Sequence, residues 1–384
     1  MIAYNPAWLD ALLIKDTARN WHINGLLSNE QWQAVQDQHP SPFYTPNLFV
    51  RIGLAIFCQI LLSSAFGLIF LIGSPDTQTG VAIFCIFCGA LCILALEMVA
   101  IRSMRHFSSG IDDMLLYVGA TAVIGGLLAL LPDSSAALVY CCFAWPILVV
   151  CSIRYLDRLM TAVAFACSLA IILLSVNEIP SLALYLLPFA GMMFSAGVYY
   201  FVHKGLQRYD LRHWHKQFTI LQLLSLCTFY ASGNYWVVQQ AGHDFFQLEQ
   251  PPISWFFWAF TFTVPALYIV LGLRYKERLP LDVGLGCTAL AVLSYRYYYE
   301  VMPLAWAGTI CGAVLFATAY LSIRYLRKNK GAYTYEADAD SSLLQQAQEQ
   351  VLAQVISTQT VNAPAKNESF GGGQFGGGGA GGEF

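Results

Sequence analysis

The sequence predicts an all-α fold, a polytopic membrane bundle of ten transmembrane helices. Of its 384 residues, 57% are hydrophobic and only 11% are charged, whereas soluble domains carry about 25% charged residues. The apolar residues gather in segments of about 17–25 residues, the length that a helix needs to cross the ~30 Å hydrocarbon core of a membrane. The basic residues between these segments fall almost entirely on one side of the predicted membrane.

Residues 1–48 precede the first apolar segment and predict a two-helix cap. Pro6 suits the first position of a helix, and the Asn24-Gly25 pair indicates the turn that follows it. Ser28, with Gln31 three residues later, has the spacing of a capping box, which marks the start of a second helix. This stretch contains no apolar signal-peptide core, so we expect it to form a cytoplasmic cap.

Ten segments are predicted to span the membrane within a transmembrane domain of residues 49–325. Their approximate bounds are 49–72, 80–101, 112–131, 134–152, 159–176, 180–202, 217–237, 253–273, 280–299 and 302–325. The longest outer connection, about 238–252, is predicted to be a loop.

Charge predicts the orientation of the bundle. All 20 Lys and Arg residues except Arg296 lie on one side of the ten segments, which the positive-inside rule assigns to the cytoplasm. The connections on the other side carry only acidic charges, at Asp76, Asp133, Glu178, Asp244 and Glu249. We therefore expect a multi-pass inner-membrane protein with both termini in the cytoplasm and the lipid bilayer as its main partner.

Two short motifs indicate an internal repeat. The run Ile153–Leu159 matches the run Leu273–Leu279 at an offset of 120 residues, and Arg105-His106-Phe107 resembles Arg212-His213-Trp214. The matched segments have the same orientation, so a duplication here would be a parallel repeat. The alternative interpretation is that Arg-Tyr pairs recur because both residues anchor helices at the headgroup level.

The residues after the last segment divide into two parts. Residues 326–359 begin with basic residues and continue as a predicted amphipathic cytoplasmic helix, whose apolar residues are Leu344, Ala347, Val351, Leu352, Val355 and Ile356. Residues 360–384 are rich in glycine and predict a disordered tail, because glycine cannot bury a core.

One candidate ligand site follows from the exceptional position of Arg296. An ionisable residue near the outer end of a membrane helix is a functional candidate, and here it would meet an anionic group. The candidate site comprises Arg296, Glu300, Tyr295, Tyr299, His243 and Asp244. The alternative is an Arg296–Glu300 ion pair, one turn apart, within an aromatic belt at the interface.

Other residues give weaker signals. Glu97 is predicted to form an interfacial ion pair with Arg102 or Arg105, and Cys85, Cys88 and Cys92 on one helix face are predicted to be packing residues. We find no phosphate-binding glycine loop, metalloprotease motif or nucleophile elbow. The sequence therefore supports no enzyme class, cofactor, metal site or nucleic-acid partner.

Two stretches resemble a known family. The opening, with Leu12-Leu13, Asn24-Gly25-Leu26-Leu27-Ser28 and Glu30-Gln31, is similar to the start of the DUF2157 multi-pass bacterial membrane proteins. The run Tyr295–Glu300 resembles an aromatic segment of those proteins and of the related DUF4401 group. The match is partial, since Leu304-Ala305-Trp306-Ala307-Gly308 stands where the family has a Leu-rich stretch and a Lys-Ser pair. The resemblance implies a bacterial inner-membrane protein without an established activity.

Two functions from different classes fit these features. The first is binding or transport of a small anionic solute through an outward-facing pocket near Arg296. The second is a non-transporting scaffold or sensor that holds a protein partner through its cytoplasmic termini, residues 1–48 and the helix predicted within 342–358.

Overall fold

The structure is a computed structural model that describes residues 2–23, 25–73, 75–132, 136–246 and 251–298, with six single positions between 309 and 324. Every regular element in these residues is a helix, and the one β-bridge joins Tyr44 to His106. The prediction of an all-α fold is confirmed.

The N-terminal cap has the two predicted helices, α1 (Pro6–Ile23) and α2 (Asn29–Gln38). The capping box is present, because Gln31 N–H donates to Ser28 Oγ at 3.2 Å and Ser28 N–H donates to Gln31 Oε1 at 2.9 Å. Gly25 makes the turn between the helices at a φ of 72°, in the left-handed region that glycine enters without steric cost.

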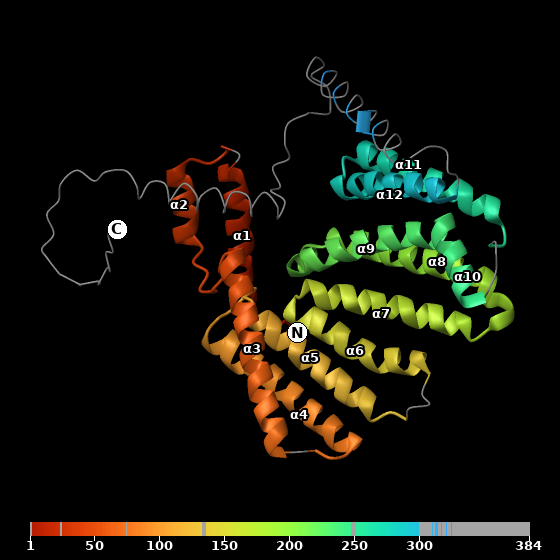
Figure 1. Ribbon diagram of the computed structural model, residues 1–384. Helices are drawn as coiled ribbons and strands as arrows, with labels where there is room; N and C mark the ends of the chain where they lie inside the picture. Colours follow the sequence, from red (N-terminus) through yellow and green to blue (C-terminus); the bar gives the residue numbers. More distant parts are fainter. Residues whose placement is uncertain are drawn as a thin grey trace, which may run out of the picture.

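The helices that follow stack roughly in chain order (Figure 1). The first group comprises α3 (Leu48–Gly73), α4 (Gln78–Ala95) with its π-helical continuation η1 (Leu96–Ser103), α5 (Ile111–Ala129), α6 (Ala137–Tyr155) and α7 (Arg158–Asn177). The second group comprises α8 (Pro180–Leu206), the 3₁₀ helix η2 (Tyr209–Trp214), α9 (His215–Gly233), α10 (Tyr235–Phe246), α11 (Ser254–Tyr275) and α12 (Arg278–Tyr298).

Seven helical segments in the described residues are long and apolar enough to cross a membrane, which is the composition of an integral membrane protein. They are α3, α4 with η1, α5, α6, α7, residues 185–206 of α8, and α11. The segments predicted at 217–237 and 280–299 correspond to α9 and α12, which are helical but less apolar. The segment predicted at 302–325 lies outside the described residues apart from single positions.

The predicted outer loop at 238–252 is wrong over its first part, because residues 235–246 form α10. The segment predicted at 217–237 ends earlier than expected, because α9 ends at Gly233. Asn234 then leaves the helix with an extended backbone, at ψ 127°. Its side-chain Oδ1 accepts from Trp236 N–H at 3.0 Å and Val237 N–H at 3.3 Å. Asn234 therefore caps a new helix, and the chain turns there instead of entering a loop.

The two copies of the Arg-Tyr motif form the same connection. Helix α6 ends at Tyr155 and α7 begins at Arg158, while α11 ends at Tyr275 and α12 begins at Arg278, so both boundaries keep the offset of 120 residues. Leu156 and Lys276 take left-handed φ values of 54° and 56° at equivalent positions. The environments differ, however, since Tyr155 is buried and Tyr275 is 65% exposed.

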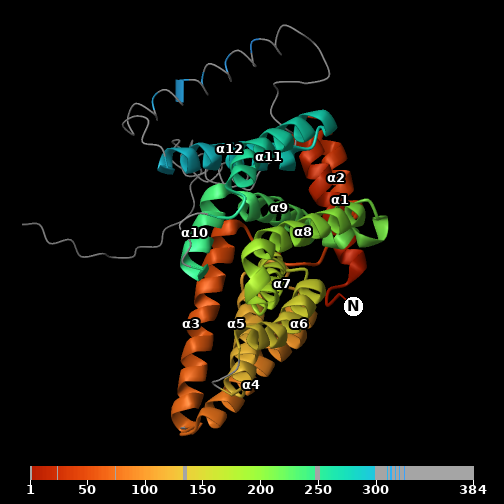
Figure 2. The same cartoon turned by 90° about the vertical axis from the view of Figure 1, so that its right-hand side faces the viewer.

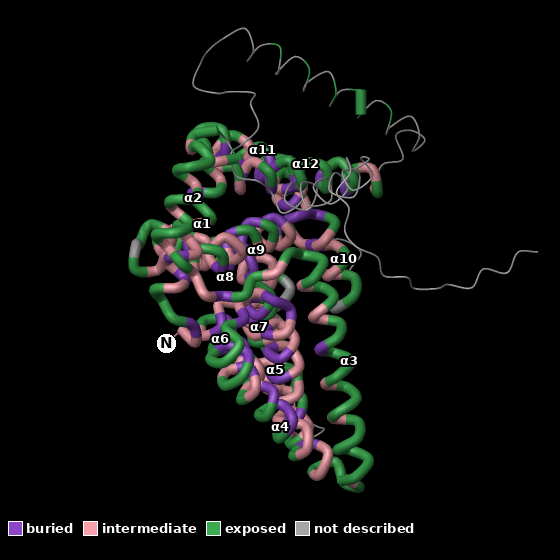
Figure 3. Tube along the Cα trace, turned by 90° about the vertical axis from the view of Figure 1, so that its left-hand side faces the viewer, coloured by how far each residue is buried: buried purple, intermediate pink, exposed green. Residues whose placement is uncertain are grey.

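Neighbouring helices pack as antiparallel pairs, α4 with α5, α6 with α7, α8 with α9, and α11 with α12. Helix α3 lies beside α5 (Figure 2). Only Cys58 of α3 is buried, so most of its length is exposed (Figure 3), as expected for an apolar helix that faces lipid. Helix α9 is the opposite case, because α7, α8, α10, α11 and α12 all contact it.

Candidate functional site

Buried polar side chains recur along the length of α9 and around more than half of its circumference, and this set is here called its polar face. Four polar side chains on this helix are buried, and they are spaced from its start to its last turn: Gln217, Gln222, Ser225 and Tyr230. Polar side chains inside a membrane bundle are costly where they meet lipid and mark functional paths where they face other helices. Because α9 is surrounded by five helices, its polar face is shielded from lipid and lies inside the bundle.

At the C-terminal end of α9 this face joins a buried polar node. Asn234 Nδ2 donates to Tyr230 Oη at 2.9 Å and to Ser294 Oγ of α12 at 3.3 Å. Tyr235 N–H donates to Thr261 Oγ1 of α11 at 2.9 Å. Asn234, Thr261 and Ser294 are all buried, so the break between α9 and α10 is held by hydrogen bonds to both neighbouring helices.

Aromatic side chains from three helices cover this node. The ring of Tyr235 in α10 stacks on Trp258 of α11 with centroids 4.5 Å apart, and it meets Tyr298 of α12 edge-on at 5.2 Å. The rings of Trp236 in α10 and Tyr297 in α12 meet edge-on with centroids 6.2 Å apart. Aromatic side chains of α10, α11 and α12 therefore contact one another around the C-terminal end of α12.

Two predicted site residues on α12, Tyr295 and Arg296, lie within the described structure. Tyr295 contacts Trp258 with centroids 6.2 Å apart. Arg296 is half-buried, and it follows Ser294 by two residues, so its Cβ points about 200° away from the side that carries the node. Tyr299 and Glu300, and with them the predicted Arg296–Glu300 pair, lie outside the described residues.

The other two predicted site residues, His243 and Asp244, lie on α10 about two turns beyond Trp236. Both are exposed, and His243 Nδ1 lies 3.4 Å from Asp244 Oδ1. Hydrogen bonds from Gln240, at 3.0 and 3.2 Å, hold the pKa of the Asp244 carboxyl below its usual value. The structure thus links the first turn of α10 to the aromatic residues of α12 and leaves His243 and Asp244 facing solvent.

At the N-terminal end of α9 the polar face reaches the α6–α7 turn. The side-chain amide of Gln217 donates to Leu156 O, and Trp214 Nε1 donates to Ile153 O at 3.1 Å. Ala3 N–H of the N-terminal segment donates to Arg154 O at 2.9 Å. The last carbonyls of a helix have no partners within it, and at the end of α6 they accept from the N-terminal segment, from η2 and from the start of α9.

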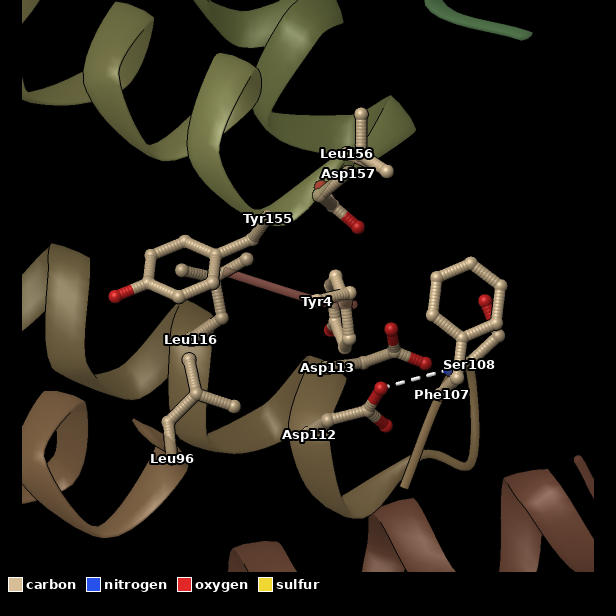
Figure 4. Close-up of a pocket in the computed structure, with 10 residues that line it drawn as sticks. All are labelled: Tyr4, Leu96, Phe107, Ser108, Asp112, Asp113, Leu116, Tyr155, Leu156 and Asp157. Carbon is tan, nitrogen blue, oxygen red and sulfur yellow. Dashed lines mark hydrogen bonds between the residues drawn. The ribbon is translucent and has the colours of Figure 1, made fainter. Parts of the chain in front are cut away.

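A small cavity of about 20 Å³ lies beside this turn (Figure 4). Three carboxylates and two tyrosines line it together with apolar and small residues: Tyr4, Leu96, Phe107, Ser108, Asp112, Asp113, Leu116, Tyr155, Leu156 and Asp157. The lining comes from the N-terminal segment, η1, the start of α5 and the α6–α7 turn. A cavity of this size has room for about one water molecule.

Local structure at the start of α5 places two of these carboxylates. Asp112 accepts from Ser108 N–H at 2.7 Å and from Ser109 N–H at 2.8 Å, so backbone donors fix it. Asp113 accepts from Arg51 of α3 at 2.6 and 2.9 Å. Gly110 makes this approach possible, since it has a φ of 94° and a Cβ there would overlap the carbonyl oxygen of Arg51.

Glu97 forms an ion pair, but its partner differs from the prediction. Arg154 Nε of α6 and Tyr155 Oη each donate to Glu97 Oε1 at 2.8 Å. The predicted pairing with Arg102 or Arg105 is wrong because Glu97 lies in the π-helix η1, whose wider turn changes which neighbour a side chain faces. Tyr155 also lines the cavity, so Glu97 is connected to it through one side chain.

The third carboxylate, Asp157, is the N-cap of α7. Its Oδ1 accepts from Met160 N–H at 2.7 Å and its Oδ2 from Tyr117 Oη at 2.9 Å. The remaining group, Tyr4, belongs to the N-terminal segment and is 5% exposed. Burial, followed by the charges of Asp112 and Asp113, raises the pKa of Tyr4 well above its usual value.

The cavity was not predicted, although two of its signals are visible in the sequence. Asp112-Asp113 opens an otherwise apolar segment, and Asp157 belongs to the repeated motif. Within the described residues no group of three His, Cys, Asp or Glu side chains is placed to hold a metal ion. The described cysteines are free thiols, and Cys88 and Cys92 are buried in α4.

The two ends of the α9 polar face thus differ in character. The start of α9 reaches a turn beside a small acidic cavity, whereas its end is covered by aromatic side chains. Comparison with protein-family models, curated proteins and solved structures finds no match for this chain.

Proposed function

We propose that this chain is a ten-span inner-membrane protein, with both termini cytoplasmic, that binds and passes a small anionic solute along the polar face of α9. The observation that carries the proposal is the set of buried polar side chains on α9, which continues into the node at Asn234. Intramembrane polar residues that face a bundle interior are typical of solute paths.

Three features of the structure support this proposal. First, α9 and α10 form a broken helix, and broken helices line the binding sites of many transporters. Second, the repeated connection at Leu156 and Lys276 favours a parallel duplication, which is also common in transporter folds. Third, Tyr298, one of the aromatic residues that cover the break, lies on the same helix as Arg296, a cation that suits an anionic ligand.

The resemblance to the DUF2157 and DUF4401 groups supports the same proposal. It rests on residues 12–31 and 295–300, and it favours a bacterial inner membrane as the location.

A thermal-shift experiment on the purified full chain in detergent tests the proposal. The probes are the sodium salts of phosphate, succinate and glutamate, with sodium chloride at equal ionic strength as the reference. We expect at least one probe to raise the Tm of the wild-type protein by several degrees and to leave Arg296→Gln unshifted, because a bound ligand stabilises the folded state by mass action. Arg278→Gln, at the inner end of the same helix and paired with Asp282, should keep the wild-type shift.

The same variants define the opposite result. A probe-dependent shift that survives in Arg296→Gln would remove Arg296 from the site, and no shift with any of the three anions would contradict an anionic solute. A loss of fold in Arg296→Gln without any probe would assign this residue a structural ion pair. Uptake of the active probe into proteoliposomes should fall in Gln222→Leu, which removes a buried polar group from the middle of the path.

A second candidate function is a scaffold that holds a protein partner through the cap. The observation in its favour is the exposed apolar surface outside the bundle, where Trp21 is 51% and Leu26 is 72% exposed and α2 buries no residue. Under this proposal, Trp21→Ser with Leu26→Ser abolishes the cellular phenotype of the gene while Arg296→Gln preserves it. The reverse pattern favours the solute path.

A further inference from the structure

The cavity beside the α6–α7 turn contains polar atoms that the protein itself leaves unsatisfied. Tyr4 is 5% exposed, and in the described part of the chain its hydroxyl has no hydrogen-bond partner. Both bonds from Arg51 go to Asp113 Oδ2, so Oδ1 of Asp113 is free of them. Tyr4 lines the cavity, so a polar occupant there would satisfy its hydroxyl.

The size of the cavity restricts the occupant. About 20 Å³ admits one water molecule and excludes organic solutes, whose pockets measure about 300 Å³ or more. The described residues contain no set of ligands for a metal ion. A water molecule and the proton that it carries are therefore the occupants that fit.

The charged side chains around the cavity have a net charge of minus one. Asp112, Asp113 and Asp157 contribute three negative charges, while Arg51 of α3 and Arg158 of α7, which act electrostatically on one another and on these carboxylates, contribute two positive charges. Tyr117 is committed to Asp157, and Tyr155 to Glu97, which Arg154 neutralises. His106 faces Ser109 at 2.7 Å, one residue further from the cavity.

The three carboxylates are not equivalent acceptors. Asp112 accepts from two backbone N–H groups and from Ser109 Oγ. Asp157 accepts from Met160 N–H on Oδ1 and from Tyr117 Oη on Oδ2, so donors already occupy both oxygens of these two carboxylates. Asp113 has the only carboxylate oxygen without a described donor. Figure 4 shows Asp113 among the residues around Tyr4, and its charge, like that of Asp112, acts on Tyr4.

We propose that this cavity is a proton-binding site, in which a water molecule held by Tyr4 carries one proton that Asp113 accepts. The proton comes from water on the inner side, no bond within the protein is broken, and the net charge of the cavity changes from minus one to zero. The site is separate from the solute path near Arg296, and it stands whether or not that path binds an anion.

Infrared difference spectroscopy on the reconstituted full chain tests the proposal. Spectra taken at successive pH values report the carbonyl stretch of a protonated carboxylic acid, which shifts in heavy water. We expect the wild-type protein to show such a band, Asp113→Asn to lose it, and Tyr4→Phe to move its midpoint by about one pH unit, a tenfold change in proton affinity. Asp244→Asn is the control, because Asp244 is an exposed carboxylate on α10.

Each variant tests a different part of the proposal. Tyr4→Phe keeps the edge-on ring contacts to Phe43 and Phe107, at 5.9 and 4.9 Å, so it should fold. Asp113→Asn leaves Arg51 without its partner, and if it fails to fold, Arg51→Gln with Asp113→Asn removes both charges. The proposal is overturned if neither Asp113 variant changes the band, or if Tyr4→Phe leaves the midpoint at its wild-type value. Arg296→Gln should have no effect on this band.

Discussion

The carboxylate of Asp10 accepts one hydrogen bond on each oxygen from the guanidinium of Arg212, both at 2.7 Å. This fork joins α1 to η2, two elements separated by about two hundred residues, and His213 adds a contact to the same carboxylate at 2.9 Å. Bidentate pairs of this kind are stronger and more specific in geometry than single ion pairs. The pair therefore fixes the cap to η2, directly before α9.

We predict that Arg212→Gln loosens the cap without unfolding the bundle. The pair is about one-third exposed on each side, so its contribution to stability is about 1 kcal/mol. The rate of proteolytic cleavage within residues 24–47, followed by mass spectrometry, should rise about fivefold. Arg208→Gln, an exposed Arg in the same connection, should be cleaved at the wild-type rate, and equal rates for both variants would contradict the prediction.

The same pair predicts a pH dependence. The hydrogen bonds from Arg212 hold the pKa of Asp10 below its usual value, which is about 3.9 in an unfolded chain. A depressed folded-state pKa contributes stability that is complete above the unfolded value and is lost as the pH falls through the folded value. Cleavage of the cap should therefore be constant from pH 7 to about 5 and should rise below about pH 4 in the wild-type protein. Asp10→Asn should abolish this rise.

Close packing of α4 against α5 predicts opposite effects for two adjacent glycines. A Cβ on Gly126 would lie 2.6 Å from the carbonyl oxygen of Ala82, whereas a Cβ on Gly125 would meet no atom within 4 Å. We expect Gly126→Ala to force the helices apart and to cost about 1–3 kcal/mol. Gly125→Ala should gain up to about 1 kcal/mol, since alanine favours helix. Thermal unfolding in detergent checks both, and equal Tm values would refute the close approach.

The node at the α9–α10 break predicts a large effect from removing one hydroxyl. Thr261→Val keeps the shape of the side chain but leaves the buried N–H of Tyr235 without its acceptor, which should cost about 1–3 kcal/mol. Thr263→Val, on the exposed side of the same helix, should change stability by less than about 0.5 kcal/mol. If the two valine variants unfold at the same temperature, the hydrogen bond to Tyr235 does not hold the break.

Labelling with a charged, membrane-impermeant maleimide checks the topology. Met104 is 57% exposed after η1, and the Asp244 side chain is 56% exposed on α10. In intact cells we expect Asp244→Cys to react and Met104→Cys to react only after the membrane is opened. Reaction of both from the outside would overturn the predicted orientation.

Local patterns predicted the helix boundaries well, because turn chemistry acts over a few residues. The capping box at Ser28 and the connections at 156 and 276 each depend on residues that lie within a few positions of one another in the sequence. The break before α10 also has a local signal, since Gly233-Asn234 is a common helix end. The apolar run from Tyr235 to Val238 directly after it nevertheless made one continuous segment the prediction.

The inner cavity could not be predicted in the same way. Tyr4, Arg51, Asp113 and Asp157 come together only because α3, α5 and the α6–α7 turn meet at one end of the bundle. No periodicity in one segment encodes that meeting. The partner of Glu97 was missed for a related reason, because a π-helix shifts the face of every residue that follows it. Arg296 stands out in the sequence by charge alone, and charge does not specify which side of α12 it occupies.

Helix α9 also bears on how the chain is inserted during synthesis. In the proposed ten-span topology α9 crosses the membrane, and a segment that carries Gln217, Gln222 and Ser225 partitions poorly from the translocon into lipid by itself. Helix α8, made just before it, can shelter the polar face of α9 as the antiparallel partner, but α11 and α12 emerge later. Release of α9 into the bilayer should therefore wait for the second hairpin, so that truncation after residue 246 leaves α9 exposed to quality-control proteases while truncation before residue 207 does not.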